Sequence, residues 1–424
     1  MVSLTFSDVT KRFAGRTVIG HLSAELAGGT VTAVTGANGS GKSTLLKLAA
    51  KLLLPDEGKI VAKDGGQALS KASYRSRIGI VTPEFHAYPK LTARENLDFF
   101  LGFRRAAPLT AMQYEQLLAR VGLSADVIDG KYVEHFSTGM KKRLHLAILL
   151  ASEADIWLLD EPGANLDDAG RSMVRREARK AADAGNSCCS RRMTEKRRRW
   201  QMHASLYRAI ESVFRKEARI SLRSRSSWLV VLMFALTTLS CVSLLMQGDT
   251  LAPRLAASML WVILFFSLLA GAGRGFADEE QAGTLMALQV YGSSQAVLFG
   301  KGLFMAVLLF ALSLLIVPMY LVLMDTSVSS WPAFLLTLLG GTYGMAMAGT
   351  LLSALMSGAK VQGGLLSILM LPVLLPILLP AIVLTASCFA GEAVHMSYLV
   401  GIALYDAIMT LAASLLFDFL WYED

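Results

Sequence analysis

With 424 residues the chain is long enough for two or more domains, and it is 54% hydrophobic but only 17% charged. Its mean hydropathy of +0.47 excludes a protein that is water-soluble along its whole length. The formal net charge of +8 comes largely from the part before Trp228, after which charges become rare. This distribution indicates a soluble basic half and a membrane half, so the basic charge favours a cytoplasmic lipid surface as partner and not nucleic acid.

Two further features concern redox state and targeting. The cysteines at 188, 189, 241 and 388 show neither C-x-x-C nor zinc spacing, so we expect reduced thiols without a cofactor. Charges begin at Asp8 and no apolar core of a signal sequence precedes them, so we expect no cleavable signal peptide.

The first predicted elements are the strands of a β-hairpin. Short apolar runs at 4–6 and 18–19 flank a turn at 11–16. Phe13 lies in this turn, where its ring either stacks on an adenine or is a partly buried loop aromatic. The spacing alone favours neither alternative.

A glycine-rich loop follows that matches G-x-x-x-x-G-K-[ST] completely. An apolar run at 31–35 predicts a strand before it and the pattern at 45–48 predicts a helix after it, a context typical of a phosphate-binding loop. Its glycines let successive N–H groups point at phosphate oxygens, and the positive end of the helix adds to the attraction. We expect Lys42 to reach the β- and γ-phosphates and the Ser43 hydroxyl to ligate Mg²⁺. The predicted nucleotide-binding residues are Gly36, Asn38, Gly39, Ser40, Gly41, Lys42, Ser43 and Thr44.

A second group of candidate residues lies far downstream. A buried-strand pattern at 156–159 ends in Asp160, where a carboxylate can ligate Mg²⁺, and then Glu161, which we expect to polarise the attacking water. Upstream, Ser137 and Gly139 precede a predicted helix at 141–151 and form another anion-binding helix end. One nucleotide needs one phosphate-binding site. We therefore expect the second site, at Ser137 and Gly139, to bind a nucleotide held by a partner chain.

Residues 1 to about 187 resemble an ABC-transporter ATPase domain. The loop at 36–44 matches its Walker A motif, 158–161 its Walker B motif and 164–167 its D-loop; 136–140 stands at the place of its Leu-Ser-Gly-Gly-Gln signature and keeps the serine and the second glycine. Phe13 falls at the position of the adenine-stacking aromatic. The resemblance implies an α/β P-loop fold that binds ATP and Mg²⁺. It also implies a head-to-tail dimer with ATP between Walker A of one chain and the signature of the other.

Two features depart from this family. The family has a glutamine near Pro83; this sequence has none, and Glu84 is the candidate to replace it. The family also has a later apolar strand that ends in a switch histidine, but no such strand can be written through 186–200. The histidines beyond Asp160 are His203 and His395, and neither follows an apolar strand. We therefore expect the switch histidine and the last strands to be missing from an ATPase domain at 1–187, followed by a basic junction at 188–204.

Three explanations of the junction stay open. The junction is a natural fusion that lost the last strands and the switch histidine, or it results from an altered reading frame between two adjacent genes. The third explanation is an ATPase that binds ATP but hydrolyses it poorly. We favour the first two together, and we expect the chain alone to hydrolyse ATP slowly, if at all.

Residues 205–424 predict an all-α membrane domain. The stretch 205–225 has an apolar and a basic face at helical spacing, which predicts an amphipathic helix on an anionic leaflet, with an ordinary surface helix as the alternative. Lys301 and other basic residues lie in the inner segments, which places both termini in the cytoplasm. Six apolar runs, each near the ~20 residues that cross a bilayer, are the predicted spans: 229–247, 255–273, 303–324, 334–356, 365–386 and 398–420.

Three features of this half are candidates for a functional role. The inner segment 274–301 holds an acidic cluster at 278–280 and then a short helix, which we expect to act as a lever against the ATPase domain and not as a solvated loop. Prolines 372, 376 and 380 share one face of the fifth span, which favours packing over lining a pathway. Asp406 lies inside the sixth span, where an ionised carboxylate is costly, so a role for it is a hypothesis.

The run 361–372 with its proline-rich continuation, the stretches 261–269 and 276–285, and the six-span layout resemble the permease of the cytochrome c maturation heme exporter, the CcmB family. The ATPase half then corresponds to that permease's usual partner, CcmA. The resemblance implies an ATP hydrolase coupled to transport, acting in heme export or heme-chaperone release, with heme as cargo only. Export of lipid, polysaccharide or drug, or a non-hydrolysing ATP-binding scaffold, are the alternatives.

The same resemblance implies where and with what the chain works. It implies a bacterial inner membrane, with the ATPase domain and both termini in the cytoplasm. One phosphate loop and six spans make half a transporter, so we expect a homodimer or ABC partner subunits. The lipid bilayer, the membrane proteins of cytochrome c maturation and a heme chaperone are the implied partners.

Overall fold

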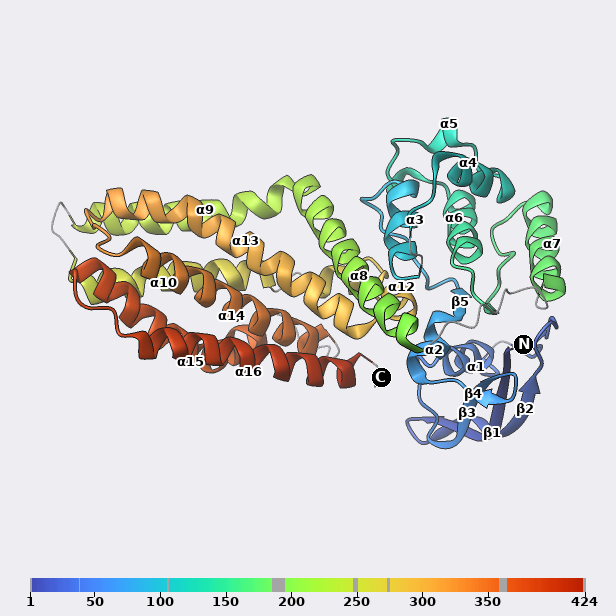
Figure 1. Cartoon of the computed structure of the whole chain (residues 1–424). Coiled ribbons are helices and arrows are strands. Elements are labelled where there is room, and N and C mark those ends of the chain that lie inside the picture. Colours follow the sequence, from blue (N-terminus) through green and yellow to red (C-terminus); the bar gives the residue numbers. More distant parts are fainter. Residues whose placement is uncertain are drawn as a thin grey trace. The chain divides into compact units, whose positions relative to one another are not determined.

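The computed structural model describes residues 2–37, 39–104, 107–184, 195–246, 251–272, 275–357 and 364–421. Asn38, the predicted boundary at 187, the start of the basic junction and residues 361–363 lie outside these ranges. The chain divides into two compact units (Figure 1): residues 1–212 with 282–293 and 421–424, and residues 213–281 with 294–420. We call the first the ATPase unit and the second the membrane unit, after the predicted domains that they contain. The short segment 282–293 belongs to the ATPase unit, although it lies between membrane segments in the sequence.

The predicted hairpin is present in the first unit. Strands β1 (Val2–Phe13) and β2 (Arg16–Leu26) pair antiparallel around a two-residue turn, so the strands are longer and the turn shorter than predicted. Both turn residues, Ala14 and Gly15, have positive φ, as tight hairpins require. Strands β3 (Glu57–Asp64) and β4 (Gln67–Ala68) extend the sheet in the order β2-β1-β3-β4.

A second, parallel sheet lies just before the two carboxylates predicted from the sequence. It consists of β5 (Ile78–Val81) and β6 (Ile156–Leu159), paired in register from Ile78–Ile156 to Val81–Leu159. Both strands are short apolar runs, as expected for strands covered on both faces.

The strand predicted at 31–35 is wrong. Residues 31–37 are neither helix nor strand, and the side chains of Val31 and Val34 are 64% and 44% exposed. An apolar run becomes a strand only where a neighbour accepts and donates its backbone hydrogen bonds. Helix α7 (Asp168–Ala184) is followed by residues 185–194, which lie outside the described ranges, so the expected loss of the last strands of this domain stays a prediction.

Helices complete the first unit. Capping boxes begin α3 and α4, where the hydroxyls of Thr92 and Thr110 accept from the backbone three residues on. Both helices pack against α6 (Thr138–Ala151), the helix that begins within the predicted signature motif at 136–140. The helices of this unit, besides α7, are α1 (Lys42–Ala49), α2 (Lys71–Ser76), α3 (Ala93–Gly102), α4 (Ala111–Arg120), α5 (Ala125–Ile128), the 3-10 turn Val133–His135, α6 (Thr138–Ala151) and α12 (Leu285–Tyr291).

The second unit is a bundle of long helices that run side by side (Figure 1). The amphipathic helix predicted at 205–225 corresponds to the later part of α8. Among the described residues, five helices are long and apolar enough to cross a membrane by length and composition, and they coincide with the last five predicted spans. The first predicted span coincides with α9, whose described apolar part is the shorter stretch Leu232–Leu244. The helices of this unit are the part of α8 (Glu195–Arg223) from Val213 on, α9 (Arg225–Met246), α10 (Pro253–Ala272), α11 (Ala277–Gln281), α13 (Ser294–Leu323), α14 (Trp331–Ser357), α15 (Gly364–Ala390) and α16 (Met396–Leu420).

The bundle has its own apolar core, with Trp261 of α10 at its centre. The Trp261 indole N–H donates to Thr385 Oγ1 of α15 at 2.9 Å, so its polar atom is satisfied inside the core. A Cβ at Gly341 of α14 would lie 2.1 Å from the Trp261 ring, so only glycine fits there. Helix α15 continues through its three prolines, and Pro372 and Pro376 are exposed, so this face does not pack in the core of the unit.

Candidate nucleotide-binding site

The glycine-rich loop ends at Gly41, which begins α1. Gly41 has φ +89°, and a Cβ there would lie 2.9 Å from Val18 Cγ1 of β2, so conformation and space both require glycine. Residues 36, 37, 39, 40 and 43 of the loop are exposed, residues 41, 42 and 44 are half-buried, and Ser43 lies in the first turn of α1. The loop therefore presents N–H groups and a helix N-terminus to solvent.

Lys42 bends back over the loop that it follows. Its ammonium group donates to the carbonyl oxygens of Gly36 at 2.9 Å and Ala37 at 2.8 Å. Backbone carbonyls therefore hold the charge over the loop, where the sequence motif predicts phosphate oxygens to bind.

The two carboxylates predicted from the sequence follow β6 directly. The Asp160 N–H donates to the Val81 carbonyl at 2.8 Å, which continues the parallel pairing one residue beyond the strand. Glu161 then adopts φ +44°, so the chain turns and its side chain is exposed. This places the two carboxylates in different surroundings at the end of the sheet.

No sequence motif singles out Lys142, whose ammonium group interacts electrostatically with both carboxylates. Partial burial lowers the pKa of the Lys142 ammonium, although the negative charges of Glu161 and Asp160 act in the opposite direction. Its one sequence signal is its position five residues after Ser137, on the helix that the signature motif begins.

The signature motif and the D-loop lie together in one chain. The Ser137 hydroxyl caps α6 by accepting from the Met140 N–H at 3.2 Å. A Cβ at Gly139 would lie 3.6 Å from the Asn165 carbonyl, and Arg143 pairs with Asp167 at 2.8 Å. In the part of the chain that the structure describes, no hydrogen bond or ion pair joins Ser137 or Gly139 to the loop at 36–44.

Two other predicted positions have defined surroundings. The Glu84 carboxylate pairs with the Lys47 ammonium of α1 at 2.7 Å. Phe13 is the last residue of β1, where its side chain is 45% exposed and Lys11 Nζ lies 5.5 Å from its ring centroid, and this exposure decides neither alternative. Adenine stacking by Phe13 stays a prediction.

The helix predicted at 283–288 is α12, and it packs within the ATPase unit. Its Tyr291 ring contacts the rings of Phe85 and Phe100, with centroids 5.9 and 5.3 Å away. The Thr82 hydroxyl donates to the Met286 sulfur at 3.6 Å. The segment 82–85, which follows β5, therefore lies under this helix.

Arg104 holds the C-terminal end of α12. Its guanidinium lies 4.5 Å from the Tyr291 ring centroid, and one of its N–H groups donates to the Val290 carbonyl at 3.4 Å. Burial lowers the pKa of Arg104, and no carboxylate pairs with it in the described ranges. The aromatic ring and the negative end of the helix are its electrostatic partners.

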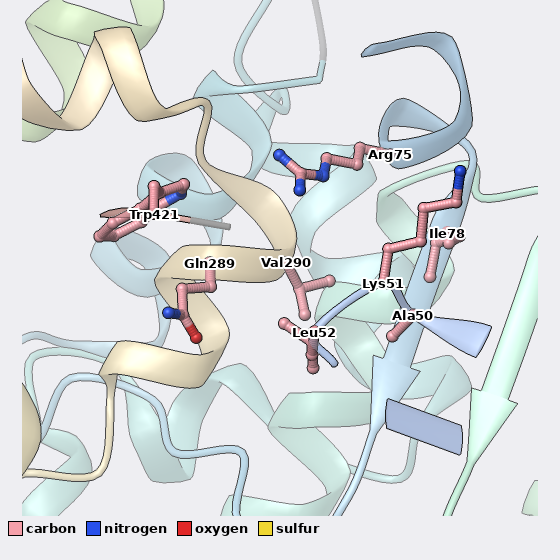
Figure 2. A pocket seen from close by; sticks show the side chains of 8 residues that line it. All are labelled: Ala50, Lys51, Leu52, Arg75, Ile78, Gln289, Val290 and Trp421. Atoms are coloured by element: carbon pink, nitrogen blue, oxygen red, sulfur yellow. The ribbon is translucent and has the colours of Figure 1, made fainter. Parts of the chain in front are cut away.

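Two more residues show how closely α12 and its neighbours pack. Gly283 has φ +67°, and a Cβ there would lie 2.8 Å from His86 Nδ1, so this approach requires glycine. Trp421, which follows the last helix, borders the same small cleft as α12 (Figure 2). The cleft is lined by Ala50, Lys51, Leu52, Arg75, Ile78, Gln289, Val290 and Trp421.

Two family models match the chain. The model for "ABC transporter" matches residues 19–164, and the model for "CcmB protein" matches residues 208–420, half of the chain.

Curated relatives match the first half. The "Sulfate/thiosulfate import ATP-binding protein CysA" of Synechocystis sp. is 34% identical over 184 residues, which are 43% of this chain and 51% of that protein. The "Cytochrome c biogenesis ATP-binding export protein CcmA" of Brucella abortus is 34% identical over 163 residues, 37% of this chain and 70% of that protein. The chain thus spans about half the length of the first relative. A solved "Structure of ATP binding subunit of ABC transporter" has a TM-score of 0.37 at 24% identity, over 42% of this chain and 74% of that one.

Proposed function

The chain belongs to the ABC transporter family through residues 19–164 and to the CcmB family through residues 208–420, and from this we propose an ATP-driven half-transporter of cytochrome c maturation. One observation carries the proposal. A single polypeptide joins a CcmB domain to an ATPase domain similar to a cytochrome c biogenesis export protein. Its role is then heme export, or the release of a heme-carrying chaperone.

The residues of the site fit ATP and Mg²⁺. The loop offers exposed N–H groups with the Lys42 ammonium over it, and β6 ends in two carboxylates. Lys42 would hold the β- and γ-phosphates, Ser43 and Asp160 would ligate Mg²⁺, and Glu161 would accept a proton from the attacking water.

A second chain completes the site in this proposal. The N–H groups at Ser137 and Gly139 begin α6 and would bind a nucleotide held by a partner, so the working unit is a homodimer or an assembly with ABC partner subunits. The membrane proteins of cytochrome c maturation and a heme chaperone would be its further partners.

We propose slow hydrolysis by the chain alone. The exposed run at 31–35 leaves the loop without a supporting strand, and Glu84 is paired with Lys47 where the family has a glutamine nearby. Phosphate release by the purified dimer at a rate typical of ABC exporters would contradict this.

Helix α12 is the proposed lever. It is held by Arg104 and the aromatic side chains of the ATPase unit, and its neighbours in the sequence are membrane segments. ATP can drive movement only through a different affinity for two arrangements, so binding of ATP would alter how α12 is held.

The chain is a multi-pass membrane protein, with five described helices apolar enough to span a bilayer. We place it in a bacterial inner membrane, with the ATPase unit and both termini in the cytoplasm. Deleting its gene and staining covalently bound heme tests the proposal. Loss of c-type cytochromes is expected, and an unchanged content would overturn the role.

A non-hydrolysing ATP-binding scaffold is the second candidate. The exposed run at 31–35, which forms no strand, and the Lys47–Glu84 pair favour it. Vanadate-sensitive ATPase activity in liposomes would exclude the scaffold, whereas ATP binding without any hydrolysis would support it.

A further inference from the structure

Four charged side chains from three helices meet inside the membrane unit. Lys216 and Glu217 come from α8, Glu279 from the short helix α11, and Lys301 from α13. The side chains of Lys216, Glu279 and Lys301 are only 2%, 4% and 5% exposed, and that of Glu217 is 16% exposed. The distribution of charges predicted Lys301 to lie in an inner segment just before the third span, and in the structure it lies inside α13 and is buried.

The four groups alternate in charge, and each ammonium contacts both carboxylates. Lys216 Nζ lies 2.7 Å from Glu217 Oε1 and 2.5 Å from Glu279 Oε1. Lys301 Nζ lies 3.0 Å from Glu279 Oε1 and also pairs with Glu217. Burial alone would raise the pKa of Glu217, but the two ammonium groups lower it, so this carboxyl is ionised.

Lys301 also holds the chain just before α11. Its ammonium donates to the Gly275 carbonyl at 2.9 Å and lies 5.0 Å from the centroid of the Phe276 ring. Buried ion pairs that also donate to a backbone carbonyl hold their geometry strictly, because any displacement leaves a buried charge without a compensating partner. The segment 275–279 is therefore fixed to α8 and to α13.

The segment 275–279 lies just before α12 in the sequence, so the cluster can transmit a displacement of that helix. Only residues 282–284 lie between α11 and α12. On the other side of α12, the hydroxyl of Ser294 at the start of α13 donates to Asp418 Oδ1 of α16 at 2.6 Å. Both ends of the lever are thus joined to membrane helices by side-chain contacts.

We propose that Lys216, Glu217, Glu279 and Lys301 form a joint that makes α13 follow a displacement of α12. If segment 275–279 were loosely held, it would move with α12 and the displacement would not reach α13. The four residues position the lever and take no part in ATP chemistry. This inference rests on the proposed function, because it requires ATP to displace α12. The alternative is that the four residues only stabilise the fold. The two roles can be separated, because well-packed apolar side chains can replace a buried ion pair without loss of stability.

Hydrogen exchange of the full chain in lipid nanodiscs tests the joint, with and without a non-hydrolysable ATP analogue and Mg²⁺. In the unaltered chain the analogue should change exchange in α12 and in the first turns of α13. Glu279→Gln should keep the α12 response and reduce the α13 response by about fivefold or more. Glu280→Gln is the matched control, because Glu280 is the exposed neighbour in the same short helix and should leave both responses unchanged.

A double variant separates a joint from a merely stabilising cluster. Glu279→Leu with Lys301→Met removes one charge of each sign and leaves Lys216 paired with Glu217. It should unfold at a temperature close to that of the unaltered chain, yet the α13 response should still be lost. An intact α13 response in either variant would overturn the joint. Absence of any response in α12 of the unaltered chain would instead overturn the proposed ATP-driven function, and the joint with it.

Discussion

The contact between Arg104 and Tyr291 should control how firmly α12 is held. A desolvated cation–π contact contributes about 2 kcal/mol, and a cation at a helix C-terminus adds about 0.3–1 kcal/mol. Arg104 makes both contacts, because its guanidinium lies 4.5 Å from the Tyr291 centroid and donates to the Val290 carbonyl. Arg104→Met loses both contacts, but it also removes a buried charge whose desolvation is unfavourable, and this gain offsets part of the loss. We therefore expect Arg104→Met to lower the free energy of opening α12 by about 1–2 kcal/mol.

A double-mutant cycle of Arg104→Met and Tyr291→Leu measures the part of this energy that depends on the Tyr291 ring. The assay is the exchange rate of α12 amides in the full chain, which reports local opening. Arg104→Met should speed α12 exchange by about 5- to 30-fold, the factor for 1–2 kcal/mol.

The unit contains a matched control. Arg94 lies 5.1 Å from the Tyr114 ring centroid and donates to the Leu109 carbonyl, so it repeats the chemistry away from α12. Arg94→Met should leave α12 exchange unchanged. Equal acceleration by both variants, or additive effects in the cycle, would refute the reasoning.

Three further predictions concern the ATPase unit. Glu161→Gln should lower ATP hydrolysis by about 10²- to 10⁴-fold with ATP affinity retained, measured by phosphate release and nucleotide binding; an unchanged rate would remove Glu161 as the base. Glu84→Gln, which abolishes the ion pair with Lys47, should raise hydrolysis without changing the unfolding temperature, and a fall in rate would show that the carboxylate is required. Burial, reinforced by nearby positive charges, lowers the pKa of His145 to about 3, so the unfolded chain binds an extra proton below the ordinary value of 6.5. Stability should then fall by about 1.4 kcal/mol per pH unit as pH drops below 6.5, and His145→Leu should remove that slope in denaturant titrations; an unchanged slope would contradict it.

The parts of the fold that local sequence determines could be predicted. The loop before α1 depends on Gly41 and Lys42, and the membrane helices depend on long apolar runs, so both patterns are visible within a few residues. The fold assignment, an α/β P-loop ABC ATPase domain joined to an all-α membrane domain, is confirmed.

The parts that depend on distant partners could not be predicted. The run at 31–35 looks like a strand, but no described neighbour pairs with it. Lys301 looks like a loop charge, yet carboxylates on α8 and α11 compensate it inside the bundle. Arg104 showed no signal at all, because Tyr291 lies 187 positions away in the sequence.

Complementation of a strain that lacks the gene tests the central claim most directly. The unaltered chain should restore c-type cytochromes, measured by stain for covalently bound heme, and Lys42→Ala should fail although it reaches the membrane in equal amount. Full restoration by Lys42→Ala would contradict the account, because the ammonium held over the loop at 36–44 would then have no part in the function.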